Sequence, residues 1–175
     1  MVNTVFLMGY MGSGKTVVGK YLSNSTNYKF YDLDNFIESR ENKKVSDIFH
    51  DHNEVHFRKL ENKYLGLLSN KVEKKIISLG GGTPCFENNQ NIIQNTPNST
   101  SVYLKCSVEE LQKRLIGGRA KRPLISHIKS SIELTEFITK HLFERSFYYE
   151  KAIVKINTDE LEVSEISNQI ENILV

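Results

Sequence analysis

Residues Gly9 to Thr16 are the feature that most constrains how this chain can fold. They read Gly-Tyr-Met-Gly-Ser-Gly-Lys-Thr and fit the pattern G-x-x-x-x-G-K-[ST]. Such loops surround phosphates with backbone N–H groups, place a lysine against them and offer a hydroxyl to Mg²⁺. An apolar run precedes the loop and a helical stripe follows it, so we predict a strand leading into a helix N-terminus, where anions bind. The residues expected to bind the nucleotide are Gly12, Ser13, Gly14, Lys15, Thr16 and Val17.

Short apolar runs alternate with helical stripes along the rest of the chain, a pattern typical of parallel sheets whose strands are joined by helices. The predicted strands are Thr4–Met8, Lys29–Tyr31, Lys75–Leu79, Ser101–Lys105 and Ile153–Asn157. Apolar residues at steps of three and four from Val163 to Leu174 predict a final helix. Residues 88–101 are polar and predict a loop after a short helix. We therefore predict one α/β domain over residues 1–175, a three-layer sandwich around a five-stranded parallel sheet.

Composition and charge limit the partners that the chain can have. Its 23 basic and 21 acidic side chains give a net charge of +2, too balanced to favour nucleic acid. No apolar run approaches the roughly 20 residues that span a bilayer, and the N-terminal pattern is that of a strand rather than of a signal peptide. We expect a cytoplasmic monomer without membrane or nucleic-acid partners. Cys85 and Cys106 lack metal-ligand spacing and are expected to stay reduced.

Glycine is concentrated in three short segments. Eight of the ten glycines lie at Gly9, Gly12, Gly14, Gly80, Gly81, Gly82, Gly117 and Gly118. Glycine permits positive φ and a close approach of backbone N–H groups to a ligand, at an entropic cost that ordinary loops avoid. Three such segments predict a binding site.

Two carboxylates follow the second predicted strand. Asp32 and Asp34 are two residues apart at the carboxyl end of the sheet, where ligands bind in open α/β folds. Residues two apart along the end of a strand point the same way, so one carboxylate could hold water bound to Mg²⁺ while the other orients or deprotonates an acceptor hydroxyl. Alternatively, Asp34 caps the helix that follows. The residues leave these two interpretations open.

A carboxylate interrupts the apolar face of the helix predicted from Asn53 to Leu68. Glu61 lies on the same face as Phe57 and needs a partner there, and Arg58 is three residues away. An arginine held in this way can present its planar fork to a substrate carboxylate. A purely structural ion pair is the alternative.

Arg145 is a similar anomaly. It continues an apolar stripe in the helix predicted between Ile132 and Tyr149, where a guanidinium is costly unless it is paired. It could bind an anionic ligand, or extend along its apolar stem to water.

The segment from Arg114 to Leu124 combines two glycines, several basic residues and a proline. It is typical of a mobile lid, which we place at about residues 112–126. Such a lid can close over ATP, exclude water and place an arginine on the transferred phosphoryl group. A solvated basic loop is the alternative.

Taken in order, these motifs resemble those of the shikimate kinase family over nearly the whole chain. The resemblance is carried by Gly9 to Thr16, by Asp32-Leu33-Asp34, by Phe57-Arg58-Lys59-Leu60-Glu61, by Gly80-Gly81-Gly82, by Arg122-Pro123-Leu124 and by Arg145 followed by Tyr149. It implies a P-loop NTPase fold of the nucleoside monophosphate kinase type. The implied reaction is transfer of the γ-phosphate of MgATP to the 3-hydroxyl of shikimate.

The resemblance also implies a role for each matched residue. Asp34, Arg58, Gly81 and Arg145 would bind shikimate, within an acceptor-binding segment at about residues 33–61. Lys15, Asp34 and Arg122 would act in catalysis, Arg122 by contacting ATP. Thr16 would ligate Mg²⁺, Asp32 would hold it through water, and Glu61 would support Arg58.

Two segments depart from the family pattern. The loop at Asn157 to Leu161 lacks the basic or amide side chain that often lies near the adenine, so adenine contacts there are expected to be through the backbone. The lid is shifted by one residue near Arg114, so the match of Arg122 is better founded than that of Arg114 or Arg119.

Other functions stay open at this point. A gluconate-type or nucleotide monophosphate kinase shares the loop and the lid, and a non-catalytic nucleotide-binding module is a third possibility. A regulatory GTPase is disfavoured, because Asn70-Lys71-Val72-Glu73 precedes a strand and ends in glutamate rather than aspartate. His50, His52 and His56 resemble metal ligands, but no acidic or cysteine partner lies at a suitable spacing, and they are expected to form a solvated helix face.

Overall fold

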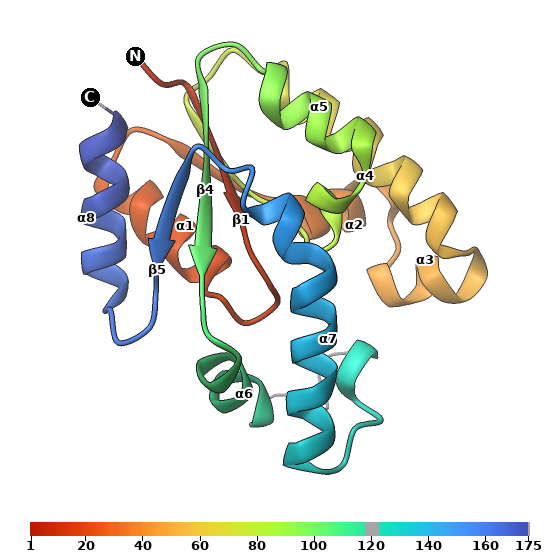
Figure 1. Cartoon of the computed structure of the whole chain (residues 1–175). Helices are drawn as coiled ribbons and strands as arrows, with labels where there is room; N and C mark the ends of the chain where they lie inside the picture. Colours follow the sequence, from red (N-terminus) through yellow and green to blue (C-terminus); the bar gives the residue numbers. More distant parts are fainter. Residues whose placement is uncertain (118–122, 175) are drawn as a thin grey trace.

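The computed structural model describes residues 1–117 and 123–174. Within them the strands form one parallel sheet in the order β2-β3-β1-β4-β5 (Figure 1). The strands are β1 (Thr4–Met8), β2 (Lys29–Asp32), β3 (Lys75–Ser78), β4 (Ser99–Lys105) and β5 (Val154–Asn157). All five lie where the sequence predicts them; β1 has the predicted ends, and the others differ by one or two residues at one end. The predicted α/β class with a five-stranded parallel sheet is confirmed.

Helices cover both faces of the sheet. They are α1 (Lys15–Ser25), α2 (Leu33–Glu41), α3 (Val45–Asp51), α4 (Glu54–Ser69), α5 (Glu87–Asn95), α6 (Val108–Ile116), α7 (Ser131–Tyr149) and α8 (Val163–Leu174). Short 3₁₀ turns, η1 (Thr83–Cys85) and η3 (Pro123–Ile125), join some of them. In Figure 1, α8 lies on one side of the strands, whereas α4, α5 and α7 lie on the other.

The alternation of side chains along β1 explains the three layers. Val5 and Leu7 pack in a buried cluster with residues of α1 and α8, while Phe6 and Met8 pack in a second cluster with residues of α2, α4, α6 and α7. Successive strand residues point to opposite faces, so an apolar run buries both faces at once. The central strand is thereby fully enclosed, and its carboxyl end holds the loop that follows in a fixed position.

The polar stretch at residues 88–101 is a helix followed by a strand, so the predicted loop is wrong. Helix α5 extends to Asn95, and β4 already begins at Ser99. The helix is stabilised by its polar residues, since the buried Asn89 donates to the carbonyl of Thr83 and accepts from the amide of Asn62. Ile93 is buried on the same element. The polar composition of this segment gave no indication of these contacts.

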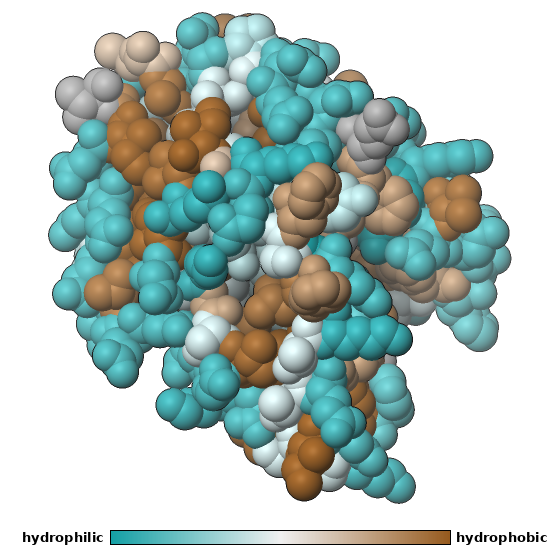
Figure 2. All heavy atoms as spheres, viewed as in Figure 1, coloured by the Kyte–Doolittle hydropathy of each residue, from teal (hydrophilic) through white to brown (hydrophobic). Residues whose placement is uncertain are grey.

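Helix α7 presents apolar side chains on two faces. Leu134, Ile138 and Tyr149 are buried, and Arg145 lies on their face at a spacing of seven residues from Ile138 and four from Tyr149. Apolar side chains also gather along α7 on the surface shown in Figure 2. The exposed apolar residues of this helix are Ile132, Phe143 and Phe147. Arg145 therefore points towards the sheet rather than towards these exposed side chains.

Candidate active site

The candidate site lies at the carboxyl ends of three adjacent strands. The loop Gly9–Gly14 follows β1, Asp32 ends β2, and the glycines Gly80–Gly82 follow β3. Because β2, β3 and β1 are neighbours in the sheet, the three segments meet at one edge. Motifs from distant parts of the sequence are thereby brought together.

The phosphate-binding loop adopts a conformation that requires glycine. Gly9, Gly12 and Gly14 have φ values of 148°, 85° and 95°. A Cβ on Gly9 would lie 2.7 Å from the carbonyl oxygen of Leu104. Gly14 is the N-cap of α1 and supplies no side-chain cap, so the first N–H groups of the helix are left for an anion.

Lys15 is buried beneath this loop. Its Nζ donates to the carbonyl oxygens of Gly9 and Tyr10, at 2.8 Å and 2.9 Å. Burial lowers the pKa of Lys15 to about 8, and the nearby charges of Asp34 and Asp32 oppose that change. The side chain is thus a positive charge held inside the loop that would enclose phosphates.

Thr16 and Asp32 form a pair of hard oxygen donors beside the loop. The Thr16 hydroxyl donates to Asp32 Oδ2 at 2.9 Å, and Asp32 Oδ1 accepts from the backbone N–H of Asn35 at 3.3 Å. Mg²⁺ prefers such oxygens and keeps several waters and phosphate oxygens as its other ligands, so the pair fits this ion. Asp32 is also the N-cap of α2. The capping role considered for Asp34 belongs to Asp32.

Asp34 lies in the first turn of α2, not on a continuing strand as the spacing argument assumed. Its Oδ1 is buried and has no hydrogen-bond partner within residues 1–117 and 123–174. Burial raises the pKa of Asp34 to about 7, and the charges of Asp32 and Glu61 add to this. Lys15 and Arg58 act in the opposite direction. A carboxylate with this pKa can exchange a proton near neutral pH.

Arg58 and Glu61 form the ion pair that the sequence predicts. Arg58 Nη1 lies 2.5 Å from Glu61 Oε2, and the Thr83 hydroxyl donates to Glu61 Oε1 at 2.5 Å. Only 1% of the Glu61 side chain is exposed. Burial raises the pKa of Glu61, and the charge of Arg58 opposes the rise. Glu61 therefore anchors Arg58, whose guanidinium carbon lies 4.7 Å from the centre of the Phe86 ring.

Two arginines from different helices meet consecutive glycines of one turn. A Cβ on Gly82 would lie 2.6 Å from Arg58 Nη2, and a Cβ on Gly81 would lie 3.6 Å from Arg145 Nη1. The Tyr149 hydroxyl donates to the Gly81 carbonyl at 2.5 Å and fixes the turn. Arg145 therefore contacts the site instead of extending to water, and the two guanidinium groups flank the same short segment.

The same turn lies against the phosphate-binding loop and the candidate base. A Cβ on Gly81 would be 3.5 Å from the backbone nitrogen of Met11, and one on Gly80 would be 3.1 Å from both Asp34 Oδ1 and Glu61 Oε1. Larger residues would fill this space. The glycines thus bring the two arginines, Asp34 and the phosphate loop within reach of one small ligand.

Three contributions to the site were missed in the sequence. Thr83 holds Glu61, Tyr149 holds Gly81, and the guanidinium of Arg145 lies 5.9 Å from the centre of the Tyr10 ring. Each contact joins elements distant in the sequence. Tyr149 had one available signal, its position on a buried stripe four residues after Arg145.

The lid is described only in part. Arg119 and Arg122 lie outside the described residues, so their predicted contacts stay predictions. Arg114 donates to the carbonyl oxygen of Gly12 at 3.4 Å and to that of Thr158 at 3.3 Å. The base of the lid is thereby tied to the phosphate loop and to the loop after β5, where we expect backbone contacts to adenine.

His50, His52 and His56, for which the sequence disfavours a metal site, lie at the end of α3 and the start of α4. The rings of His52 and His56 face each other with centroids 4.3 Å apart. Among residues 1–117 and 123–174, no group of three or more His, Cys, Asp or Glu side chains could hold a metal ion. Cys85 and Cys106 are both free. None of the described helices is long and apolar enough to cross a membrane.

The chain is similar to known proteins over nearly its whole length. The family model described as shikimate kinase matches residues 11–174. The shikimate kinase of Flavobacterium johnsoniae is 44% identical over 170 residues, which cover 97% of this chain and 98% of that protein. The crystal structure of shikimate kinase from Bacteroides thetaiotaomicron has a TM-score of 0.90 at 35% identity, covering 98% of this chain and 97% of that one. Shikimate kinase from Acinetobacter baumannii in complex with shikimate has a TM-score of 0.88 at 26% identity, covering 99% and 93%.

Proposed function

The chain belongs to the shikimate kinase family, and we infer that it transfers the γ-phosphoryl group of ATP to the 3-hydroxyl of shikimate. The products are shikimate 3-phosphate and ADP, a step of chorismate and aromatic amino acid biosynthesis. The observation that carries this function is the meeting of Arg58 and Arg145 at consecutive glycines beside the phosphate-binding loop. A small carboxylate with a hydroxyl group matches such a site.

The donor half of the site is the loop with the start of α1. The backbone N–H groups from Gly12 to Val17 would bind the phosphates of ATP, and the charge of Lys15 would stabilise the phosphoryl oxygens during transfer. Thr16 and Asp32 would hold Mg²⁺, Asp32 through water. When bound, this ion neutralises charge on the phosphates. Arg122 of the lid is proposed to contact ATP as the lid closes.

The acceptor half holds shikimate by its carboxylate and directs its hydroxyl towards the donor. Arg58 and Arg145 would bind the carboxylate together, with Gly81 in contact beside them. Glu61 and Thr83 keep Arg58 in place through the hydrogen bonds described above. Asp34 would accept the proton of the attacking hydroxyl, or align that hydroxyl, because its carboxylate lies next to the same glycine turn.

We place the protein in the cytoplasm, where ATP is supplied, and propose that it acts as a monomer. Its substrates would be shikimate and ATP, with no nucleic-acid or membrane partner. Light scattering during gel filtration at micromolar concentration tests the monomer, and a mass near twice 20.1 kDa would contradict it.

The function is tested by offering MgATP with a panel of acceptors and measuring ADP release. We expect release to depend on shikimate, and not on gluconate or a nucleoside monophosphate. A nucleoside monophosphate has no carboxylate for the arginine pair, whereas gluconate has one and therefore tests whether a carboxylate and a hydroxyl are sufficient. Release that depends on another acceptor, and not on shikimate, would overturn the assignment. Removal of Mg²⁺ with a chelator should abolish release.

Replacement of Arg58 by alanine should raise the KM for shikimate by about 10- to 100-fold, equivalent to about 1.4–2.8 kcal/mol of lost binding. kcat should change less, because Arg58 binds a part of the substrate that does not react. Arg58→Lys keeps the charge but loses the fork and should also raise KM.

Lys59→Ala is the matched control for Arg58→Ala, since Lys59 is an exposed cation on the same helix. Steady-state kinetics with shikimate varied at saturating MgATP make the comparison. An unchanged KM in Arg58→Ala would remove Arg58 from the acceptor site. The melting temperature should be measured as well, because the substitution leaves the buried Glu61 without its cation.

A further inference from the structure

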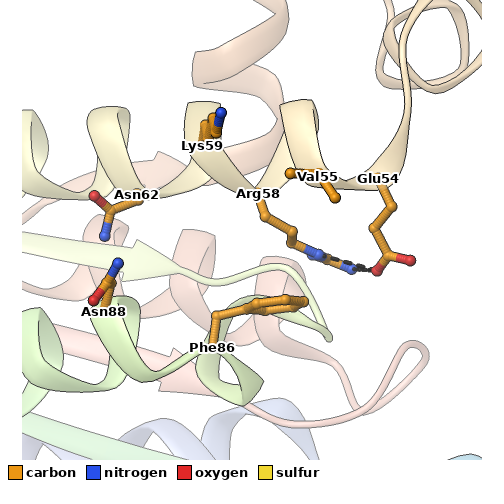
Figure 3. A pocket seen from close by; sticks show the side chains of 7 residues that line it. All are labelled: Glu54, Val55, Arg58, Lys59, Asn62, Phe86 and Asn88. Carbon is orange, nitrogen blue, oxygen red and sulfur yellow. Dashed lines mark hydrogen bonds and ion pairs between the residues drawn. The ribbon is translucent and has the colours of Figure 1, made fainter.

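Arg58 binds a second carboxylate, that of Glu54, in addition to the carboxylate of Glu61. Glu54 Oε1 accepts from Arg58 Nη2 at 2.8 Å and from Nε at 3.2 Å (Figure 3). These two N–H groups form one edge of the guanidinium fork, the edge that binds a carboxylate in a side-on bidentate arrangement. Glu61 takes Nη1 instead. Glu54 thus occupies one complete edge of Arg58, the arginine that we propose binds the carboxylate of shikimate.

The two carboxylates on Arg58 differ in how firmly they are held. Glu61 is almost fully buried and is also bound by Thr83, whereas 61% of the Glu54 side chain is exposed. Exposed ion pairs contribute little to stability, so the pair with Glu54 opens at small cost. Glu54 also lies in the first turn of α4, where the helix N-terminus favours a carboxylate whether or not it contacts Arg58.

Charge makes the present arrangement unsuitable for an anionic acceptor. Glu54 and Glu61 together carry two negative charges against the single positive charge of Arg58. A third carboxylate would be repelled, and like charges in contact are unfavourable. Once Glu54 leaves, Arg58 and Glu61 neutralise each other, and the charge of Arg145 is available for the carboxylate of the substrate.

The displaced side chain has space to occupy. A cavity of about 580 Å³ opens beside Arg58 and is lined by Glu54, Asn88 and Phe86 among others. Figure 3 shows Glu54 and Val55 at one end of this cavity and the amides of Asn62 and Asn88 at the other. A rotamer change of an exposed glutamate is enough to move its carboxylate away from Arg58.

We propose that Glu54 competes within the protein for the place of the acceptor carboxylate on Arg58. It occupies the Nε–Nη2 edge in the free enzyme and leaves that edge when shikimate binds. This inference rests on the proposed function. The competition favours acceptors that have a carboxylate. Shikimate can replace the carboxylate of Glu54 on Arg58 with its own, whereas an acceptor without a carboxylate cannot.

The test is the affinity for shikimate of two variants, measured by isothermal titration calorimetry because the chain has no tryptophan for fluorescence. Glu54→Gln removes the charge and should lower the Kd for shikimate by about 1.5- to 5-fold, which corresponds to the free energy that exposed ion pairs contribute. Glu54→Asp keeps the charge but shortens the side chain, and it should tighten binding too if occupation of the fork is what opposes shikimate. Neither variant should change the weak binding of the methyl ester of shikimate.

Glu109→Gln is the matched control, since Glu109 is an exposed glutamate in the first turn of α6 and its replacement makes the same change in net charge. Its affinity should equal that of the wild type. Unchanged or weaker shikimate binding by Glu54→Gln would overturn the proposal, as would a Glu54→Asp variant identical to the wild type. If wild-type protein releases no ADP in response to shikimate, the proposed function fails by itself, whatever Glu54 does.

Discussion

Asp34→Asn should lower kcat by about 10²- to 10⁴-fold, the range over which general acid–base catalysis contributes. Asparagine keeps the size and the hydrogen-bonding oxygen of the side chain but cannot accept the proton of the attacking hydroxyl. The KM for shikimate should change much less, because the arginines that would hold its carboxylate stay in place. Steady-state kinetics with shikimate and MgATP, compared with Asp47→Asn, make the measurement. Asp47 is an exposed aspartate in the first turn of α3.

The pH dependence distinguishes proton transfer by Asp34 from simple alignment of the hydroxyl. Burial raises the pKa of Asp34 to about 7. If the carboxylate is the base, kcat/KM should fall tenfold for each unit of pH below about 7, because the protonated form is inactive. Asp34→Asn should lose this limb of the profile. A wild-type profile that is flat from pH 5 to 8 would show that Asp34 acts by alignment alone.

The same substitution should make the protein more stable above neutral pH. The pKa of Asp34 is raised in the folded chain, so folding favours the protonated form. The resulting stability is complete below the unfolded pKa of about 4 and is lost as the pH rises through about 7. Asp34→Asn stays neutral throughout. Its melting temperature should therefore exceed that of the wild type by several degrees at pH 8 and match it at pH 4, at about 2–4 °C for each kcal/mol.

Sequence patterns located most of this site because each motif is local. The loop from Gly9 to Gly14 needs its glycines for backbone conformation, and Arg58 and Glu61 are neighbours on one helix turn. Such features depend on short-range geometry that the chain fixes wherever it folds. Buried strands with apolar runs gave the sheet for the same reason.

Contacts between distant segments could not be predicted in this way. Spacing within one segment places Tyr149 on a buried stripe, but it indicates neither the hydrogen bond of Tyr149 to Gly81 nor that of Thr83 to Glu61. The period of two predicts a strand position for Asp34, but Asp34 lies two residues beyond the end of β2. Helix α2 begins at Leu33, and Asp32 caps it.

The sequence also could not predict that Glu54 occupies one edge of Arg58. The sequence indicates only that Glu54 is an acidic residue at the start of a helix. Its significance comes from the exposed position and the fork that it covers. Helical spacing brings three charged residues together, but which donor each carboxylate takes depends on Thr83 and on the packing of Phe86 against the guanidinium.

Lys15→Ala should lower kcat by about 10²- to 10³-fold, the loss expected when a charge that stabilises a developing oxyanion is removed. The positive charge held beneath the phosphate loop is not replaced by another side chain of α1. Lys15→Met should behave alike, since it keeps the apolar stem and loses only the charge. The KM for ATP should rise less than kcat falls, because backbone N–H groups still bind the phosphates.

The melting temperature and the turnover number together distinguish a role of Lys15 in phosphoryl transfer from a structural role. Lys15 also donates to the carbonyls of Gly9 and Tyr10, so its loss could disturb the loop. Its lowered pKa shows that the buried ammonium is itself costly, and we therefore expect the melting temperature of Lys15→Met to stay within a few degrees of the wild type. Lys20→Ala, on the exposed face of α1, is the control. Turnover by Lys15→Met equal to that of Lys20→Ala would exclude Lys15 from phosphoryl transfer.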